Sequence, residues 1–193
     1  MSLAHRLREA LAAGTNAGRL TGDMEEHDPA SGTPAAVLIA VTDRTDPGVI
    51  LTVRREHMRT HAGQIAFPGG RLDPGEDVVT AALREAHEEI LLEPSTVNLV
   101  GVLEPYRTVT NYRVTSVIGV IPPDLPLHPH EHEVADWFEA PLDYLLDASN
   151  QECRSALFQG CERHYYEIVW EDRRIWGATA AMIVNLSRRL GRA

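Results

Sequence analysis

GGRLDPGEDVVTAALREAHEE, residues 69–89, ends in three glutamates at helical spacing. Glu85, Glu88 and Glu89 stand at positions i, i+3 and i+4, so a helix places them on one face. Like charges at this spacing destabilise an isolated helix by roughly 0.2–0.5 kcal/mol per pair, and a bound cation would reverse that effect. Carboxylate oxygens suit Mg²⁺ or Mn²⁺ rather than softer metals. The stretch therefore predicts a helix that carries a divalent metal site.

The same stretch has a second, apolar face. Its members recur at helical spacing on the side away from the glutamates: Val79, Ala82, Leu83, Ala86 and Ile90. Pro74 and Gly75 mark the turn before the helix, which we expect to begin between residues 74 and 77. The alternative is an ordinary solvated helix face, in which Arg84 is only a counter-charge.

The spacing of these residues resembles the signature of Nudix hydrolases, which cleave diphosphate bonds in molecules that carry a nucleoside diphosphate. Gly70 is followed by Glu76 after five residues, by Arg-Glu after seven more, and by Glu-Glu after two more. One position departs, because Leu91 stands where a glycine is usual. A glycine there would form a left-handed helix C-cap, so the end of this helix is left open.

A narrower resemblance lies upstream. Residues 50–54 (ILTVR), Arg59 and residues 61–70 (HAGQIAFPGG) are similar to the extra signature of the coenzyme A pyrophosphatase branch. Arg55 stands where that branch usually has serine or alanine. Three later segments also resemble the branch: residues 101–105, 120–126 and 176–180. The resemblance implies hydrolysis of coenzyme A, or a derivative of it, to 3′,5′-adenosine diphosphate and the 4′-phosphopantetheine moiety.

The distribution of charge supports a small anionic ligand. The chain has 18 basic and 28 acidic residues and a formal charge of −10. Residues 54–71 nevertheless contain a single acid among six basic or imidazole side chains: Arg54, Arg55, His57, Arg59, His61 and Arg71. Arginine binds phosphate oxygens through two parallel hydrogen bonds. A duplex nucleic acid would instead need a basic face over most of the domain. An exposed basic loop without a ligand is the alternative.

The resemblance also implies roles for individual residues. The metal ligands would be Glu85, Glu88, Glu89 and a backbone carbonyl at Gly69. The substrate would be positioned by Arg54, Arg59, His61 and Gln64, with Gly70 allowing close approach of the backbone. Catalysis would involve Glu88 and Glu133, the second as candidate general base, with Glu131 as its alternative.

A histidine-rich segment precedes Glu133. Residues 128–133 read HPHEHE, a composition that could indicate a zinc or nickel site. Histidines spaced by two around a proline are not the helical i, i+4 pair of metalloproteases. A solvated loop and a loop that carries a catalytic residue are the other interpretations.

Length and pattern together predict the architecture. A chain of 193 residues with 44% hydrophobic content fits one domain. We expect an N-terminal helix, ending near residues 13–14, and a mobile polar loop within residues 1–33, followed by a Nudix domain over residues 34–193. Strand-like runs are expected at residues 35–41, 49–53, 97–103, 113–121, 134–138, 165–170 and 173–176, and a last helix at residues 178–190. The resemblance sharpens this mixture to an α/β/α sandwich with a mixed β-sheet.

The sequence lacks the marks of a membrane or secreted protein. It has neither an apolar run near eighteen residues nor a basic-then-apolar leader, so a cytoplasmic protein without a membrane partner is expected. Cys153 and Cys161 are expected to be unpaired thiols. The expected partner is a small-molecule substrate, not nucleic acid, and a homodimer is left open.

Two rival functions remain. The first keeps the chemistry and changes the substrate to ADP-ribose, NADH, a dinucleoside polyphosphate or an oxidised nucleotide. The second is a ligand-binding regulator that has kept the fold and lost catalysis. The intact glutamates argue against the second rival.

Overall fold

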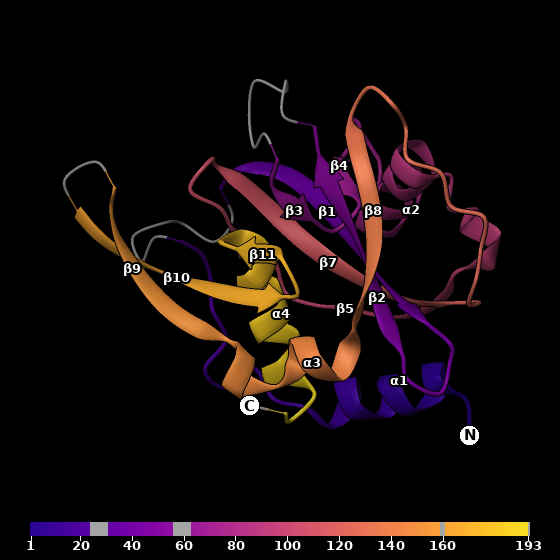
Figure 1. The fold of residues 1–193 in the computed structure, drawn as a ribbon, viewed down its shortest axis with the longest axis horizontal. Coiled ribbons are helices and arrows are strands. Elements are labelled where there is room, and N and C mark those ends of the chain that lie inside the picture. The colour runs from indigo at the N-terminus through magenta and orange to yellow at the C-terminus, as the bar shows by residue number, and fades with distance from the viewer. Residues whose placement is uncertain (24–30, 56–62, 159–160, 193) are drawn as a thin grey trace.

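The computed structural model describes residues 1–23, 31–55, 63–158 and 161–192. Within them, helices cover both faces of a mixed sheet, and a smaller sheet packs with the helices of one face (Figure 1). The α/β/α sandwich expected from the sequence is confirmed. The strands of the larger sheet are β1 (Thr33–Thr42), β2 (Gly48–Arg54), β3 (Ile65–Ala66), β4 (Gly69–Arg71), β5 (Asn98–Val102), β6 (Tyr106–Arg107), β7 (Tyr112–Ile121) and β8 (Val134–Pro141).

A fork between β1 and β2 positions the glycine-rich segment. The two strands pair only at Val41 and Val49, and they separate beyond that point. Strand β3 pairs with β2, and β4 pairs with β1, where Gly69 lies opposite Val37. The chain between β3 and β4 thus crosses from one side of the fork to the other. This crossing places Gly69 and Gly70 at the seam of the sheet.

The rest of the sheet is continuous around this fork. Strands β1 and β7 are parallel over their whole length, while the other strand pairs are antiparallel. Helix α2 (Val78–Ile90) covers one face through small and branched side chains. The other face is covered by α1 (Leu3–Ala13), the short α3 (Leu142–Leu146) and α4 (Ala178–Arg189). Two short 3-10 helices lie in loops, at Pro94–Thr96 and Ala148–Asn150.

The N-terminal helix belongs to the core of the molecule. Its end at Ala13 agrees with the prediction, and its buried Leu3 and Leu11 join the core beneath the sheet. The segment that follows is attached by hydrogen bonds, because Leu20 exchanges two with the Asn185 side chain at 2.8 and 2.9 Å. Residues 24–30 of the expected mobile loop lie outside the described residues. The division at residue 33 stays a prediction.

The C-terminal third contains structure that the sequence did not predict. A second sheet contains β9 (Glu152–Phe158), β10 (Cys161–Trp170) and β11 (Arg173–Trp176). The expected hairpin around residues 171–172 is present. Strand β9, the first half of β10 and helix α3 were missed. Figure 1 shows β9 and β10 projecting from the side of the molecule away from α2.

Two further expectations concern exposure. Cys153 is an exposed free thiol on β9, while the side chain of Cys161 lies outside the described part. Among the described residues, the structure has no helix that combines the length and the apolar character needed to cross a bilayer.

Candidate metal and substrate site

The acidic helix begins with a side-chain cap. The Asp77 carboxylate accepts hydrogen bonds from the backbone N–H groups of Val79 and Thr80, at 2.9 and 3.1 Å, and from the Thr80 hydroxyl at 2.6 Å. These bonds satisfy donors that have no partner within the helix. The helix therefore begins at Val78, one residue after the predicted range, because Asp77 serves as the cap.

The helix ends at the position where the sequence departs from the expected glycine. Leu91 adopts the left-handed conformation, with φ 55° and ψ 32°, and its N–H donates to the carbonyls of Ala86 and His87. Its side chain is exposed. The turn that a glycine would have formed is thus made by leucine, and the end of the helix is preserved.

The three glutamates differ strongly in depth, which the helical spacing did not predict. The Glu88 side chain is 57% exposed and the Glu85 side chain 17%, whereas the Glu89 side chain is only 5% exposed. Glu89 therefore lies at the edge of the packing face, beside the buried Ile90. The exposed fraction of these side chains therefore falls from Glu88 through Glu85 to Glu89.

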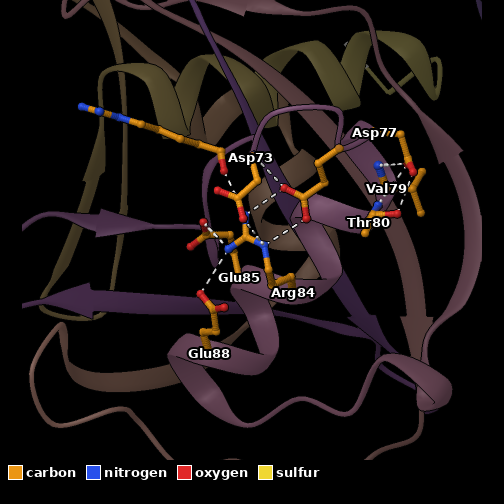
Figure 2. Close-up of polar contacts among 9 residues, drawn as sticks. Asp73, Asp77, Val79, Thr80, Arg84, Glu85 and Glu88 are labelled. Carbon is orange, nitrogen blue, oxygen red and sulfur yellow. Dashed lines mark hydrogen bonds and ion pairs between the residues drawn. The ribbon is translucent and has the colours of Figure 1, made fainter.

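Arg84 forms hydrogen bonds with several of the acidic side chains on and before the helix (Figure 2). Its Nε and Nη2 donate to the two carboxylate oxygens of Glu76, at 2.9 and 3.0 Å. Its Nη1 donates to Glu85 at 2.9 Å and to Glu88 at 3.1 Å, and Nη2 also reaches the carbonyl of Arg71 at 3.0 Å. The hydrogen bond from Arg84 lowers the pKa of Glu76. Arg84 thus bridges four groups, whereas the alternative interpretation of the sequence made it only a counter-charge.

The glycines at the seam of the sheet allow the glutamates to approach the backbone. The N–H of Gly69 donates to Oε2 of Glu89 at 3.2 Å. A Cβ atom at Gly70 would lie 2.4 Å from the Glu85 carboxylate, much closer than a normal contact. Glycine is therefore required for Glu85 to occupy this place.

Burial shifts the pKa values of the two deeper glutamates, Glu85 and Glu89. Burial raises the pKa of Glu89 to about 8, although the Gly69 N–H and Arg54 act in the opposite direction. Burial also raises the pKa of Glu85, against the effect of Arg84. The carboxylate of Glu133 adds to both shifts, so it lies near enough to interact with each of them. The site concentrates negative charge that a cation would stabilise.

These groups fit a hard divalent cation. Glu85, Glu88 and Glu89 offer carboxylate oxygens, which Mg²⁺ and Mn²⁺ prefer. In the described ranges, no three His, Cys, Asp or Glu side chains are already gathered around a point suited to a metal. The guanidinium of Arg84 instead occupies the space between Glu85 and Glu88 and balances their charge. A cation at these glutamates would compete with that guanidinium.

The upstream motif meets the acidic helix through Arg54. Its Nη1 lies 3.8 Å from Oε1 of Glu89. The backbone N–H of Arg54 donates to the carbonyl of Gln64 at 3.0 Å, which joins the end of β2 to β3. Arg59 and His61, which were predicted to contact substrate, lie outside the described residues.

The histidine-rich loop packs against the end of the acidic helix. The backbone N–H groups of His128 and His130 donate to the carbonyls of Ile90 and Glu89, at 3.0 and 2.8 Å. The loop and Leu91 line an open cavity of about 280 Å³. Glu131 and Glu133 are exposed, so both carboxylates are accessible to water. Exposure of these carboxylates fits both a solvated loop and a loop that carries a catalytic residue, so the role of the loop stays a prediction.

Known families provide an independent comparison. The model of the family described as NUDIX domain matches residues 32–158. The uncharacterized Nudix hydrolase NudL of Escherichia fergusonii is 44% identical over 158 residues, which cover 81% of this chain and 82% of the relative. NudL of Shigella flexneri serotype 5b is 42% identical over 165 residues, covering 85% and 86% of the two chains.

Solved structures show a weaker similarity. A MutT/nudix family protein from Enterococcus faecalis has a TM-score of 0.49 and 15% identity, covering 97% of this chain and 68% of that one. The Nudix hydrolase RenU of M. smegmatis has a TM-score of 0.48 and 22% identity, covering 67% and 78%.

Proposed function

The chain belongs to the Nudix hydrolases, enzymes that act on diphosphate bonds, and from this premise we propose that its substrate is coenzyme A or a derivative of it. The observation that carries the proposal is the contact between two motifs. Arg54, from the coenzyme A-like motif, lies 3.8 Å from Glu89 of the Nudix motif. A substrate phosphate held by Arg54 would therefore lie next to the acidic helix. The products would be 3′,5′-adenosine diphosphate and the 4′-phosphopantetheine moiety.

The cation would be held by Glu85, Glu88 and Glu89, with the carbonyl of Gly69 as a further ligand. A bound Mg²⁺ or Mn²⁺ supplies positive charge against the diphosphate oxygens. Gly70 keeps a side chain out of the space beside Glu85, so that the backbone and the carboxylate remain close. Arg84 hydrogen-bonds Glu85 and Glu88 when no cation is bound, and a cation would take its place at these two carboxylates.

Proton transfer would fall to exposed carboxylates. Glu133 is exposed and lies near Glu85 and Glu89, so it would take the proton of the attacking water as general base. Glu131 is the alternative in the same loop. Arg54 would orient the diphosphate for attack in line with its leaving group, and Gln64, with Arg59 and His61, would position the adenosine end.

Product analysis tests the substrate. Purified protein with Mg²⁺ or Mn²⁺ is given coenzyme A, ADP-ribose, NADH and a dinucleoside polyphosphate in parallel, and products are separated by chromatography. We expect the highest kcat/KM for coenzyme A, with release of 3′,5′-adenosine diphosphate. A higher kcat/KM for another diphosphate would reject coenzyme A as the substrate. The assignment as a Nudix hydrolase would still stand. No turnover of any compound would favour a ligand-binding regulator.

Replacement of single glutamates tests the metal site. Glu88→Gln and Glu89→Gln should each lower kcat by roughly a hundredfold or more, the scale of losing one group that stabilises transition-state charge. Because both glutamates act on one cation, their effects should not be independent. The decrease in kcat of the double variant should be much smaller than the product of the two single decreases. Glu93→Gln is the matched control, since Glu93 is an exposed glutamate just beyond the helix. Full activity of Glu89→Gln in chelator-treated buffer would reject this metal site.

A further inference from the structure

Arg55 follows β2 at a point where the pairing with β8 is irregular. Val53 pairs with Asp136 but Arg54 pairs with Val134, which leaves Ala135 as an extra residue on β8. Bulges of this kind often lie beside active sites and redirect the chain. Beyond the bulge, the N–H of Arg55 donates to the carbonyl of Glu133 at 3.2 Å. Arg55 is thus attached to the loop that carries the candidate general base.

The Arg55 side chain has no charged partner among the described residues. Its Nε is buried without a hydrogen-bond partner, and no hydrogen bond or ion pair of its side chain occurs among the described residues. Arg84 differs, since its guanidinium contacts four acceptor groups. Buried polar atoms in folded proteins are almost always hydrogen-bonded, and exceptions commonly coincide with a ligand or a functional role. A guanidinium without such a partner, on a residue whose backbone is bonded to the loop of Glu133, is suited to an anionic ligand.

We propose that Arg55 binds a phosphate monoester of the substrate, distinct from the diphosphate that is cleaved. Arg55 lies just beyond the last residue of β2 and its backbone is bonded to Glu133, whereas the Arg54 side chain lies against Glu89. The two arginines are therefore placed to meet different groups of the substrate. This inference rests on the proposed function, because the substrate named there carries such a group, the 3′-phosphate of its adenosine.

A buried unpartnered Nε alone does not carry this inference. Arg113 on β7 has the same property, but its backbone pairs with Arg107 of β6 and not with the loop of Glu133. What distinguishes Arg55 is the combination of the missing charged partner among the described residues, the bulge and the hydrogen bond to Glu133. Arg113 consequently provides a control with a similar side chain in a different place.

The test compares coenzyme A with dephospho-coenzyme A, which lacks only the 3′-phosphate. Arg55→Ala should lower kcat/KM for coenzyme A by roughly ten- to a hundredfold, the effect of losing one charge-assisted contact, and leave the value for dephospho-coenzyme A unchanged. Arg55→Lys keeps the positive charge but not the parallel N–H donors of the guanidinium. Its kcat/KM for coenzyme A should therefore fall less than that of Arg55→Ala. Arg113→Ala should change both substrates by the same factor.

The ratio of kcat/KM for coenzyme A to kcat/KM for dephospho-coenzyme A distinguishes a binding defect from a folding defect. A variant that is partly unfolded loses activity on both compounds equally, so only a contact with the 3′-phosphate moves the ratio. Equal losses in Arg55→Ala, or no loss, would overturn the assignment of Arg55 while leaving the proposed function intact. Failure of the wild type to hydrolyse either compound would instead reject the proposed function.

Discussion

At the scale of single residues, the most consequential feature is the burial of Glu89. The sequence predicted correctly that residues 85, 88 and 89 share one side of a helix. It could not predict their depth, because depth depends on how the seam between β1 and β2 meets the helix. The hydrogen bond from Gly69 to Glu89 exists only once β4 has paired with β1.

This burial makes stability depend on pH. The pKa of Glu89 is about 8 in the folded protein against an ordinary value of 4.5, so the folded state keeps a proton that the unfolded chain releases. Without divalent cations, the contribution of Glu89 to stability is therefore greatest below about pH 4.5 and is lost as the pH rises to about 8. The loss amounts to several kcal/mol, at about 1.4 kcal/mol per pH unit.

Glu89→Gln removes this dependence while keeping an acceptor for the Gly69 N–H. We expect the variant to gain stability relative to the wild type as the pH rises from about 5 to about 8. Urea unfolding in the presence of a chelator measures the difference. A difference that stays constant over this range would contradict the raised pKa. Added Mg²⁺ should stabilise the wild type more than the variant.

At the scale of elements, the acidic helix shows what local sequence decides. Turn residues placed its start within one residue of the observed Val78, because caps are local interactions, whereas its end at Leu91 was left open by the sequence. Strand β9 gave no such signal. Its side chains from Glu152 to Leu157 are all exposed, so no alternation of apolar and polar residues marks it. The hairpin at residues 171–172 was predictable because Ile168 and Ile175 are buried opposite each other.

The left-handed conformation of Leu91 at the end of the helix lowers the stability of the fold, and a substitution by glycine should restore it. A side chain in this conformation costs about 1 kcal/mol or more, and Leu91 is 50% exposed, so little packing would be lost. Leu91→Gly should raise the free energy of unfolding by about 1 kcal/mol. Leu91→Ala is the control, since alanine keeps the Cβ atom and should bring no gain. Equal stability of the two variants in urea would show that Leu91 is unstrained.

At the scale of the whole molecule, the N-terminal helix bears on where the domain begins. From the sequence we expect an N-terminal helix and a mobile polar loop at residues 1–33, ahead of the Nudix domain at residues 34–193, because the family resemblance begins only near residue 35. The structure places Leu3 and Leu11 in the core beneath the sheet. Contacts between segments so distant in sequence leave no local pattern, and they depend on the assembled sheet.

Leu11→Ala tests this coupling. Replacing a buried leucine by alanine typically costs about 2–5 kcal/mol, and we expect a loss in this range in the full chain. Glu9→Ala, at an exposed position of the same helix, should change stability little. The free energy of unfolding of both variants is measured in urea, with one slope of free energy against urea concentration used for all curves. A negligible effect of Leu11→Ala would support the division at residue 33.

The projecting hairpin has a consequence for amide hydrogen exchange. Strand β11 pairs with β10 only from Glu167 to Trp170, so β9 and the preceding part of β10 form a two-stranded ribbon. Such ribbons are marginally stable alone, and their amides exchange with deuterium through local opening. The amides between β1 and β7 lie in the centre of the sheet and exchange through global unfolding. We therefore expect two exchange regimes, with isotope labelling of the hairpin preceding that of β1 and β7.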